Sequence, residues 1–211
     1  MAPRDGRCKV NMKDISLIGF MGCGKSSVGK ILATLLPECR LIDLDTYIEE
    51  KQGKNIPEIF NEYGEAAFRR MEREALEEIF SDKSRPRAIL SLGGGTVTSE
   101  QCRQLIRQHT DCFYLRATTD TLLDNLEGHS DGRPMLNPVQ PAEASPTETS
   151  SERESLRHRI ETLMQTRSPQ YLATANHIID IDGQTFAQIA ALIKETVEVN
   201  TLNIKRYHIH L

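Results

Sequence analysis

The octapeptide GFMGCGKS at residues 19–26 constrains the fold of this chain more than any other feature. A short apolar run, ISLIG at 15–19, leads into it. From Val28 onward apolar residues recur at i, i+3, i+4 and i+7, the spacing of an amphipathic helix. The octapeptide matches the pattern G-x-x-x-x-G-K-[ST] in the strand–loop–helix context of a P-loop. Glycines suit such a loop because its backbone N–H groups must curl inward around a phosphate. The pattern therefore predicts an α/β domain that binds phosphate.

Apolar runs and amphipathic stretches alternate along the rest of the chain. Further strands are expected at 40–45, 88–95, 112–117 and 177–182. Helices are expected at 46–52, at 65–80, from a cap at Thr98 to about 108, at 118–128 and from 186 onward. The strands are apolar enough to be buried on both faces, which indicates a parallel sheet between two layers of helices. A chain of 211 residues fits a single domain of this kind.

Composition limits the possible functions. Lys and Arg total 26 against 30 Asp and Glu, for a formal net charge of −4, so the sequence lacks the basic footprint of a general nucleic-acid binder. No run approaches the ~18 apolar residues of a membrane span, and the polar start does not resemble a secretory signal. The five cysteines are dispersed without a CxxC pair, which is typical of a reduced cytosolic protein. We therefore expect a cytoplasmic protein without nucleic-acid or membrane partners, and by default a monomer.

One segment breaks the alternation. Residues 128–152 are rich in Pro, Ser and Thr and poor in apolar side chains, which on composition alone indicates a disordered linker. A long loop inside a compact domain is otherwise a functional lid. The Gly-Arg-Pro at 132–134 favours the lid, because Arg133 could swing over a transferring phosphate and stabilise its charge.

Two carboxylates stand in DLD at 43–45, at the end of the second expected strand. Alternate residues of a strand share a face, so Asp43 and Asp45 are expected to point the same way, at the sheet edge where ligands bind. Asp43 is a candidate ligand of Mg²⁺ together with the hydroxyl of Ser26, and Asp45 could orient an acceptor hydroxyl and take its proton. The alternative is a solvated strand end or a helix cap.

Arginines and glycines supply further candidates. Arg69 either forms ion pairs on an exposed helix face or belongs to the site. Arg167 extends the apolar stripe of its predicted helix rather than the solvent face, and an arginine there requires an anion. Gly93, Gly94 and Gly95 follow a strand and expose bare backbone N–H groups, more than a plain tight turn needs. We expect them to cradle a substrate.

Together these parts place a nucleoside triphosphate on the P-loop, with Lys25 at its β- and γ-phosphates and Mg²⁺ on Ser26 and Asp43. On the opposite side, an aspartate suggests hydroxyl groups and two arginines suggest a carboxylate, which they can grip in bidentate fashion. The acceptor is thus a small hydroxylated acid. The residues alone do not separate shikimate from gluconate.

The motifs GFMGCGKSSVGK, DLD, IFNEYGEAAFRRMERE, LSLGGGTVT, GRPML and RSPQY come in the order and rough spacing of shikimate kinases, and about residues 14–195 resemble that family. The resemblance implies a three-layer αβα P-loop fold with a five-stranded parallel sheet in the order 2-3-1-4-5, a substrate-binding helical region and a mobile lid at about 128–152. It implies one kinase domain at 14–199, between a flexible extension at 1–13 and a tail at 200–211. The family transfers the γ-phosphoryl group of ATP to the 3-hydroxyl of shikimate, a step towards chorismate and the aromatic amino acids.

The resemblance also implies roles for individual residues. Lys25, Asp45 and Arg133 would be catalytic, Arg133 as the lid arginine, and Ser26 and Asp43 would hold Mg²⁺. The residues that would bind ATP are Gly22, Cys23, Gly24, Lys25, Ser26, Ser27 and Arg133. The residues that would bind shikimate are Asp45, Gly93, Gly94 and Gly95, the carboxylate-gripping Arg69 and Arg167, and the pocket-lining Phe60 and Phe68.

The chain departs from the family pattern in two places. Members commonly carry a basic residue in the helix before the lid, where this chain has Asp124 and Asn125, so Arg116 or a residue near Asp182 would have to compensate at the nucleotide base. The lid is also longer, with an insertion after Asn137. Two alternatives stay open: a kinase of the same fold with another acceptor such as gluconate, and a non-catalytic P-loop sensor.

Overall fold

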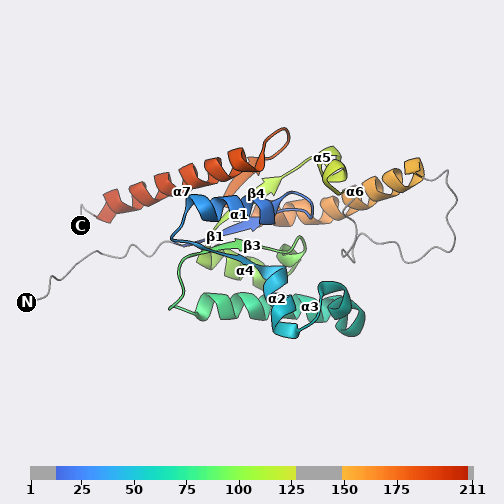
Figure 1. Cartoon of the computed structure of the whole chain (residues 1–211), viewed down its shortest axis with the longest axis horizontal. Helices are drawn as coiled ribbons and strands as arrows, with labels where there is room; N and C mark the ends of the chain where they lie inside the picture. The colour runs from blue at the N-terminus through green and yellow to red at the C-terminus, as the bar shows by residue number, and fades with distance from the viewer. Residues whose placement is uncertain (1–12, 127–148, 209–211) are drawn as a thin grey trace, which may run out of the picture.

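The computed structural model describes residues 13–126 and 149–208 of the chain. Its centre is a sheet of five parallel strands in the order β2-β3-β1-β4-β5 (Figure 1). The strands are β1 (Asp14–Ile18), β2 (Arg40–Asp43), β3 (Ala88–Ser91), β4 (Thr110–Arg116) and β5 (His177–Asp180). This order is the one that the resemblance implied, so the predicted three-layer P-loop fold is confirmed.

Helices cover both faces of the sheet. Figure 1 shows α1 (Lys25–Leu35) and α7 (Phe186–His208) together on one face, and α3 (Ile56–Ser81) and α4 (Glu100–His109) on the other. The remaining elements are α2 (Leu44–Gln52), α5 (Thr119–Leu126), α6 (Thr149–Thr174) and a 3₁₀ turn, η1 (Thr96–Thr98). In the part of the chain that the structure describes, none of the helices combines the length and apolar character that crossing a bilayer requires.

Each face of the sheet has its own hydrophobic core, because successive strand residues point to opposite sides. In β4, Phe113 and Leu115 belong to the core beneath α1 and α7, whereas Cys112 and Tyr114 belong to the core beneath α3 and α4. All four side chains are excluded from solvent. Two packed faces hold the parallel strands in register, and so bring the loops after β1, β2 and β3 together at one edge.

The structure corrects the predicted end of the second strand. β2 ends at Asp43, whose carboxylate caps α2 by accepting a hydrogen bond from the N–H of Thr46 at 3.4 Å. Asp45 therefore lies in the first turn of a helix, and the prediction that it shares a strand face with Asp43 is wrong. The physical reason is that an aspartate side chain satisfies the free N–H groups of a helix start, which ends the strand.

Two helix starts also differ from the prediction. α4 is capped by Ser99 and not by Thr98, because residues 96–98 form the turn η1. α3 begins at Ile56, well before the predicted 65, behind a capping box in which Asn55 and Glu58 each accept the other's backbone N–H. The helix is interrupted at Gly64, which has a φ of 75°, so the predicted helix at 65–80 is only its second part.

The predicted lid and the two ends of the chain are described only in part. α6 starts at Thr149, so 149–152 are helical, and the remainder of the predicted lid at 128–152 lies outside the described residues. The predicted extension at 1–13 also lies outside them apart from Lys13. At the other end, α7 runs to His208 and passes through most of the predicted tail at 200–211.

Candidate functional site

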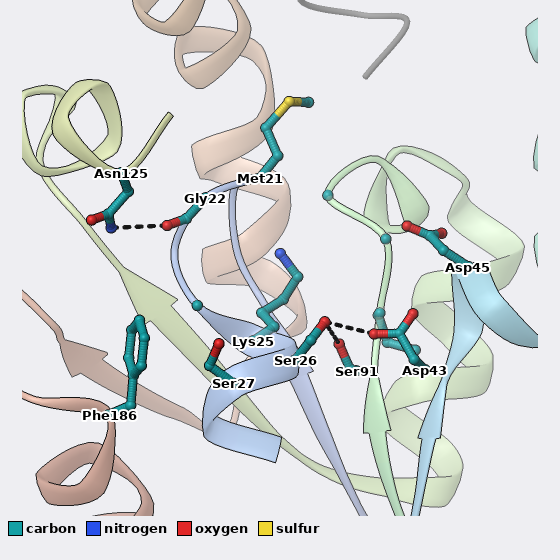
Figure 2. Close-up of a pocket in the computed structure, with 14 residues that line it drawn as sticks. Met21, Gly22, Lys25, Ser26, Ser27, Asp43, Asp45, Ser91, Asn125 and Phe186 are labelled. Carbon is teal, nitrogen blue, oxygen red and sulfur yellow. Dashed lines mark hydrogen bonds between the residues drawn. The ribbon is translucent and has the colours of Figure 1, made fainter. Parts of the chain in front are cut away.

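A pocket of about 430 Å³ opens at the carboxyl ends of β1, β2 and β3, the edge of a parallel sheet where ligands bind (Figure 2). The P-loop forms one wall, and the loop after β3 and the start of α2 form the opposite wall. The residues that line it are Met21, Gly22, Gly24, Lys25, Ser26, Ser27, Asp43, Asp45, Ser91, Leu92, Gly93, Gly94, Asn125 and Phe186.

The P-loop curls around the ammonium group of Lys25. Its Nζ donates hydrogen bonds to the carbonyl oxygens of Gly19 (2.9 Å) and Phe20 (3.0 Å), and only 8% of the residue is exposed. Gly24 precedes α1 with a φ of 86°, a left-handed conformation that a side chain would strain. The N–H groups at the start of α1 therefore face the pocket, and the helix adds partial positive charge there.

Oxygen atoms gather at the floor of the pocket. The hydroxyl of Ser26 donates to Oδ2 of Asp43 at 2.6 Å and lies 3.1 Å from the hydroxyl of Ser91 (Figure 2). Hydroxyl and carboxylate oxygens are the ligands that Mg²⁺ prefers, so the donor atoms of Ser26 and Asp43 fit that ion. Sequence reasoning gave Ser91 no role, although it belongs to the motif LSLGGGTVT, because a single serine at the end of a strand does not by itself indicate a ligand.

Asp45 faces the pocket from the first turn of α2. Its Oδ1 is buried and has no hydrogen-bond partner among the described residues. Burial, together with the carboxyl groups of Glu72 and Asp43, raises the pKa of Asp45 to about 7, and Lys25 opposes this rise. A Cβ atom on Gly93 would lie 2.9 Å from both Asp45 Oδ1 and Glu72 Oε1, so glycine at this position lets the two acidic side chains approach the loop.

Arg69 lies behind the three glycines and is held by two carboxylates. Its Nη1 donates to Glu72 Oε2 at 2.7 Å and its Nη2 to Glu65 Oε1 at 3.0 Å. Glu72 is fully buried and also accepts a hydrogen bond of 2.5 Å from the hydroxyl of Thr96. Burial raises the pKa of Glu72, while Arg69 and Thr96 act against the rise. A Cβ atom on Gly95 would lie 2.2 Å from Arg69 Nη2, so the guanidinium group rests directly against this glycine.

The predicted aromatic pair lies beside Arg69. The rings of Phe60 and Phe68 are 4.8 Å apart, and the guanidinium carbon of Arg69 is 5.5 Å from the centre of the Phe68 ring. Both phenylalanines come from α3, on either side of the break at Gly64. The break therefore brings the first part of α3 back over the region where Arg69 is held.

Arg167 reaches the same region from α6. It is only 3% exposed, and its Nη1 has no hydrogen-bond partner in the described part of the chain. The guanidinium carbon is 5.9 Å from the ring of Phe20, and its charge acts on Glu72. A buried N–H group without a partner costs about 1–3 kcal/mol in folding free energy. An anionic ligand that accepts a hydrogen bond from this group would remove that cost, so Arg167 is well placed to bind one.

The structure thus brings together most of the predicted site residues, but in two layers. Among the candidates, the P-loop residues with Asp43, Asp45, Gly93 and Gly94 line the pocket, whereas Arg69, Arg167, Gly95, Phe60 and Phe68 lie next to it without lining it. Cys23 is buried behind the P-loop with its Sγ 3.8 Å from Lys25 Nζ. Arg133 lies outside the described residues.

The sequence suggested Arg116 or a residue near Asp182 as a substitute for the absent basic residue. Arg116 forms a bidentate ion pair with Asp180: its Nε donates to Oδ1, and its Nη2 donates to Oδ2 at 2.7 Å. Arg116 does not line the pocket. Asp182 accepts hydrogen bonds from the backbone and hydroxyl of Thr118, both at 3.1 Å. These interactions join β4 and β5 and the loops that follow them. Asp182 itself does not line the pocket, whereas Phe186, four residues later, does.

Two further residues, one from α5 and one from α7, line the pocket beside the P-loop. Asn125 donates to the carbonyl oxygen of Gly22 at 2.9 Å, so the amide braces the P-loop (Figure 2). Phe186, which is 39% exposed, presents its ring to the pocket and touches Gly24, where a Cβ atom would lie 2.4 Å from the ring. Sequence reasoning placed Phe186 only on the buried stripe of the last helix. Its place as the first residue of α7, next to the loop after β5, was the missed signal.

Comparison with known proteins identifies the family. The family model for shikimate kinase matches residues 21–198. Shikimate kinases from Chlorobaculum tepidum and Thermus thermophilus are 36% and 35% identical to this chain, over 91% and 87% of its length and 92% and 88% of theirs. Among solved structures, the shikimate kinase from Acinetobacter baumannii in complex with shikimate has a TM-score of 0.76 and 30% identity, and the match covers 90% of this chain and 96% of that one. On sequence and on fold alike, this chain belongs to the shikimate kinase family.

Proposed function

We propose that this protein transfers the γ-phosphoryl group of ATP to the 3-hydroxyl group of shikimate, which gives shikimate 3-phosphate on the route to chorismate and the aromatic amino acids. The family supports this reaction. The structural observation that carries the proposal is that Lys25 of the P-loop and the buried Oδ1 of Asp45, which has no hydrogen-bond partner among the described residues, belong to one pocket. Such an arrangement serves a phosphoryl donor on one side and an acceptor hydroxyl on the other.

The donor lies on the P-loop wall. The backbone N–H groups of residues 22–27 bind the phosphates of ATP, and Arg133 is the lid arginine. The ammonium group of Lys25 exchanges the carbonyl oxygens of Gly19 and Phe20 for the β- and γ-phosphates. Phe186 offers its exposed ring to the adenine, in place of the basic residue that this chain lacks before the lid.

The acceptor lies on the wall formed by α2 and the glycine loop. Asp45 and the backbone of the three glycines bind the hydroxyl groups of shikimate. Arg69 and Arg167 bind its carboxylate. Both guanidinium groups act on the same buried carboxyl group, that of Glu72, and two guanidinium groups can satisfy a single carboxylate in bidentate fashion. Phe60 and Phe68 pack against the ring of the substrate.

Asp45 takes the proton of the 3-hydroxyl as the hydroxyl oxygen forms its bond to the γ-phosphorus. The bond between that phosphorus and the β–γ bridging oxygen breaks, and ADP leaves with the electron pair. Lys25 and the N-terminus of α1 stabilise the negative charge on the transferring group. The work of the protein is positioning and charge stabilisation, as in other phosphoryl transfers.

Mg²⁺ would be held by Ser26 and Asp43, and when bound it would neutralise charge between the β- and γ-phosphates. In the described ranges no cluster of three or more His, Cys, Asp or Glu side chains could hold a metal by itself. The ion would therefore depend on ATP oxygens and water for the rest of its coordination. We also infer a cytoplasmic monomer that acts without nucleic-acid or membrane partners.

The experiment that tests the function measures ADP release with Mg·ATP in parallel assays with shikimate, with gluconate and without an acceptor. We expect turnover with shikimate alone. Release with gluconate at a similar kcat/KM would assign another acceptor to the same pocket. ATP binding without turnover on either acid would mean that the chain is a sensor and would overturn the proposal.

A further inference from the structure

A second pocket lies at the opposite edge of the sheet, where β1, β3 and β4 begin. Its volume is about 380 Å³. The residues that line it are Lys13, Asp14, Phe80, Asp82, Lys83, Arg85, Pro86, Arg87, Gln108 and His109, and we call it the amino-edge pocket. None of these residues belongs to the proposed kinase site, because the strands run from this edge toward the P-loop.

The two carboxylates of the amino-edge pocket are already satisfied. Asp14 accepts from both Nη1 (3.0 Å) and Nη2 (2.5 Å) of Arg85, and its Oδ1 also accepts the N–H of Ala88 at 2.8 Å. Asp82 accepts the N–H (2.9 Å) and the hydroxyl (2.6 Å) of Ser84, and these bonds lower its pKa. Asp14 and Arg85 therefore cancel each other in charge, and Asp82 stays ionised.

Three cations remain in the amino-edge pocket. Lys13 donates to the carbonyl oxygen of Arg107 at 3.2 Å, Lys83 to that of Phe80 at 2.8 Å, and Arg87 to that of Lys13 at 2.6 Å. Within the described ranges, no carboxylate forms an ion pair with any of the three. A carbonyl oxygen uses one N–H and carries no net charge, so each cation keeps further donors. Three positive charges against Asp82 leave an excess of two.

The imidazole of His109 forms part of the same wall. Its ring stacks on Phe80 with 4.7 Å between the ring centres and an interplanar angle of 18°. Burial lowers the pKa of His109, and the cations Lys83, Lys13 and Arg85 lower it further, while Asp14 acts in the opposite direction. Burial first, and then the positive surroundings, favour the neutral ring, and an anion placed among these cations would favour its protonated form.

We propose that the amino-edge pocket binds a small oxyanion with two negative charges, of the class of inorganic phosphate and phosphate monoesters. The excess of two positive charges matches a dianion, and ammonium and guanidinium groups at one cavity provide the charge-assisted hydrogen bonds that phosphate oxygens accept. The aromatic face of Phe80 and His109 closes one side without competing acceptors.

The test is calorimetric titration of the full-length protein with inorganic phosphate and, separately, with glycerol 3-phosphate. Ionic strength is held constant with chloride, and a non-hydrolysable ATP analogue with Mg²⁺ saturates the P-loop so that phosphate cannot bind there. We expect saturable binding of one anion per chain. A preference for either compound identifies free phosphate or a monoester as the ligand. An absence of saturable binding with both would overturn the proposal.

Two matched double variants locate the binding. Lys13→Gln with Lys83→Gln removes two exposed cations of the pocket, and Lys30→Gln with Lys194→Gln removes the same charge from exposed or half-exposed positions on α1 and α7. We expect affinity to fall by about tenfold or more in the first pair and to change little in the second, because lost charge-assisted hydrogen bonds act only locally. Equal losses in both pairs would show non-specific attraction and overturn the proposal. Thermal melts check that both variants are folded.

His109 provides a second, local measurement of anion binding that is independent of the calorimetric signal. Its imidazole signals can be assigned in NMR spectra by their loss in His109→Gln, and its titration can be followed without and with saturating sulfate, a dianion that does not itself titrate near neutral pH. We expect sulfate to move the titration midpoint of His109 upward. An unchanged midpoint would mean that the anion does not enter the amino-edge pocket.

Discussion

The phenol of Tyr171 donates a hydrogen bond of 2.5 Å to the carbonyl oxygen of Gly94. Tyr171 is fully buried in α6, and its ring stacks on Tyr114 of β4 with 4.9 Å between the ring centres. Arg167 lies one turn earlier on the same helix. One hydrogen bond thus fixes the glycine loop relative to the helix that supplies an arginine to the proposed acceptor site.

Tyr171→Phe should weaken shikimate binding selectively. The variant keeps the stacked ring and removes the hydrogen bond to Gly94, whose loss costs about 0.5–1.5 kcal/mol, or roughly 2- to 12-fold in affinity. We expect the KM for shikimate to rise in that range with the KM for ATP unchanged. Tyr63→Phe, at a residue that is 44% exposed, is the matched control. A parallel rise of both KM values would instead indicate general loosening of the core.

Arg69→Lys should also affect the acceptor side only. Lysine keeps the charge but cannot bind Glu72, Glu65 and a substrate carboxylate at once with a planar fork. Hydrogen bonds to charged groups contribute about 1.5–3 kcal/mol, so we expect the KM for shikimate to rise by roughly tenfold or more. Arg70→Lys, on the exposed side of α3, should leave kinetics unchanged. Indistinguishable kinetics for the two variants would show that Arg69 is purely structural.

Phe186→Ala tests the nucleotide wall. Stacking of a base on an aromatic ring contributes about 1–3 kcal/mol, so we expect the KM for ATP to rise by roughly tenfold and the KM for shikimate to stay constant. Leu192→Ala removes another exposed apolar side chain of α7 that does not line the pocket and serves as the control. An unchanged KM for ATP in Phe186→Ala would show that the ring does not contact the base.

The features that sequence predicted well are those with local signals. The P-loop pattern and the alternation of buried runs with amphipathic helices are legible within short windows, and the family resemblance added the strand order. The prediction that Asp45 lies on a strand was wrong because Asp43 caps a helix, and the helix begins where the strand was expected to continue. The alternation of side chains along a strand gives no information about such a cap. Even so, Asp45 lines the same pocket as Asp43, at the edge of the sheet where the sequence analysis expected it.

Other features depend on contacts that no window contains. Glu72 stands in a glutamate-rich helix and looks like a solvated residue, yet it is buried because Thr96 and Arg69 satisfy it. Asn125 braces Gly22, which lies 103 residues away in the sequence, and Phe186 meets Gly24 only once α7 has packed on α1. Burial and long-range pairing of this kind follow from the completed fold.

The pH dependence of turnover should report Asp45. Burial and its acidic neighbours raise the pKa of this carboxyl group to about 7, so the free protein carries it protonated below that pH and ionised above it. Only the ionised form can accept the hydroxyl proton, and kcat/KM for shikimate should therefore fall as the pH is lowered through 7. Asp45→Asn should lower kcat by about 10²–10⁴-fold and abolish this limb of the profile. A profile that keeps the limb in the variant would assign the titration to another group.

Lys25→Met should separate folding from chemistry. Methionine fills a similar volume, and the buried P-loop keeps its glycines and its helix, so the melting temperature should change far less than the activity. Loss of the ammonium group at the transferring phosphate should lower kcat/KM by about 10²-fold or more. Lys30→Met, on the exposed side of α1, controls for the lost charge and should retain wild-type kinetics. Near-wild-type turnover in Lys25→Met would remove Lys25 from the mechanism, whereas a folded and inactive variant that still binds shikimate would confine the defect to the donor side.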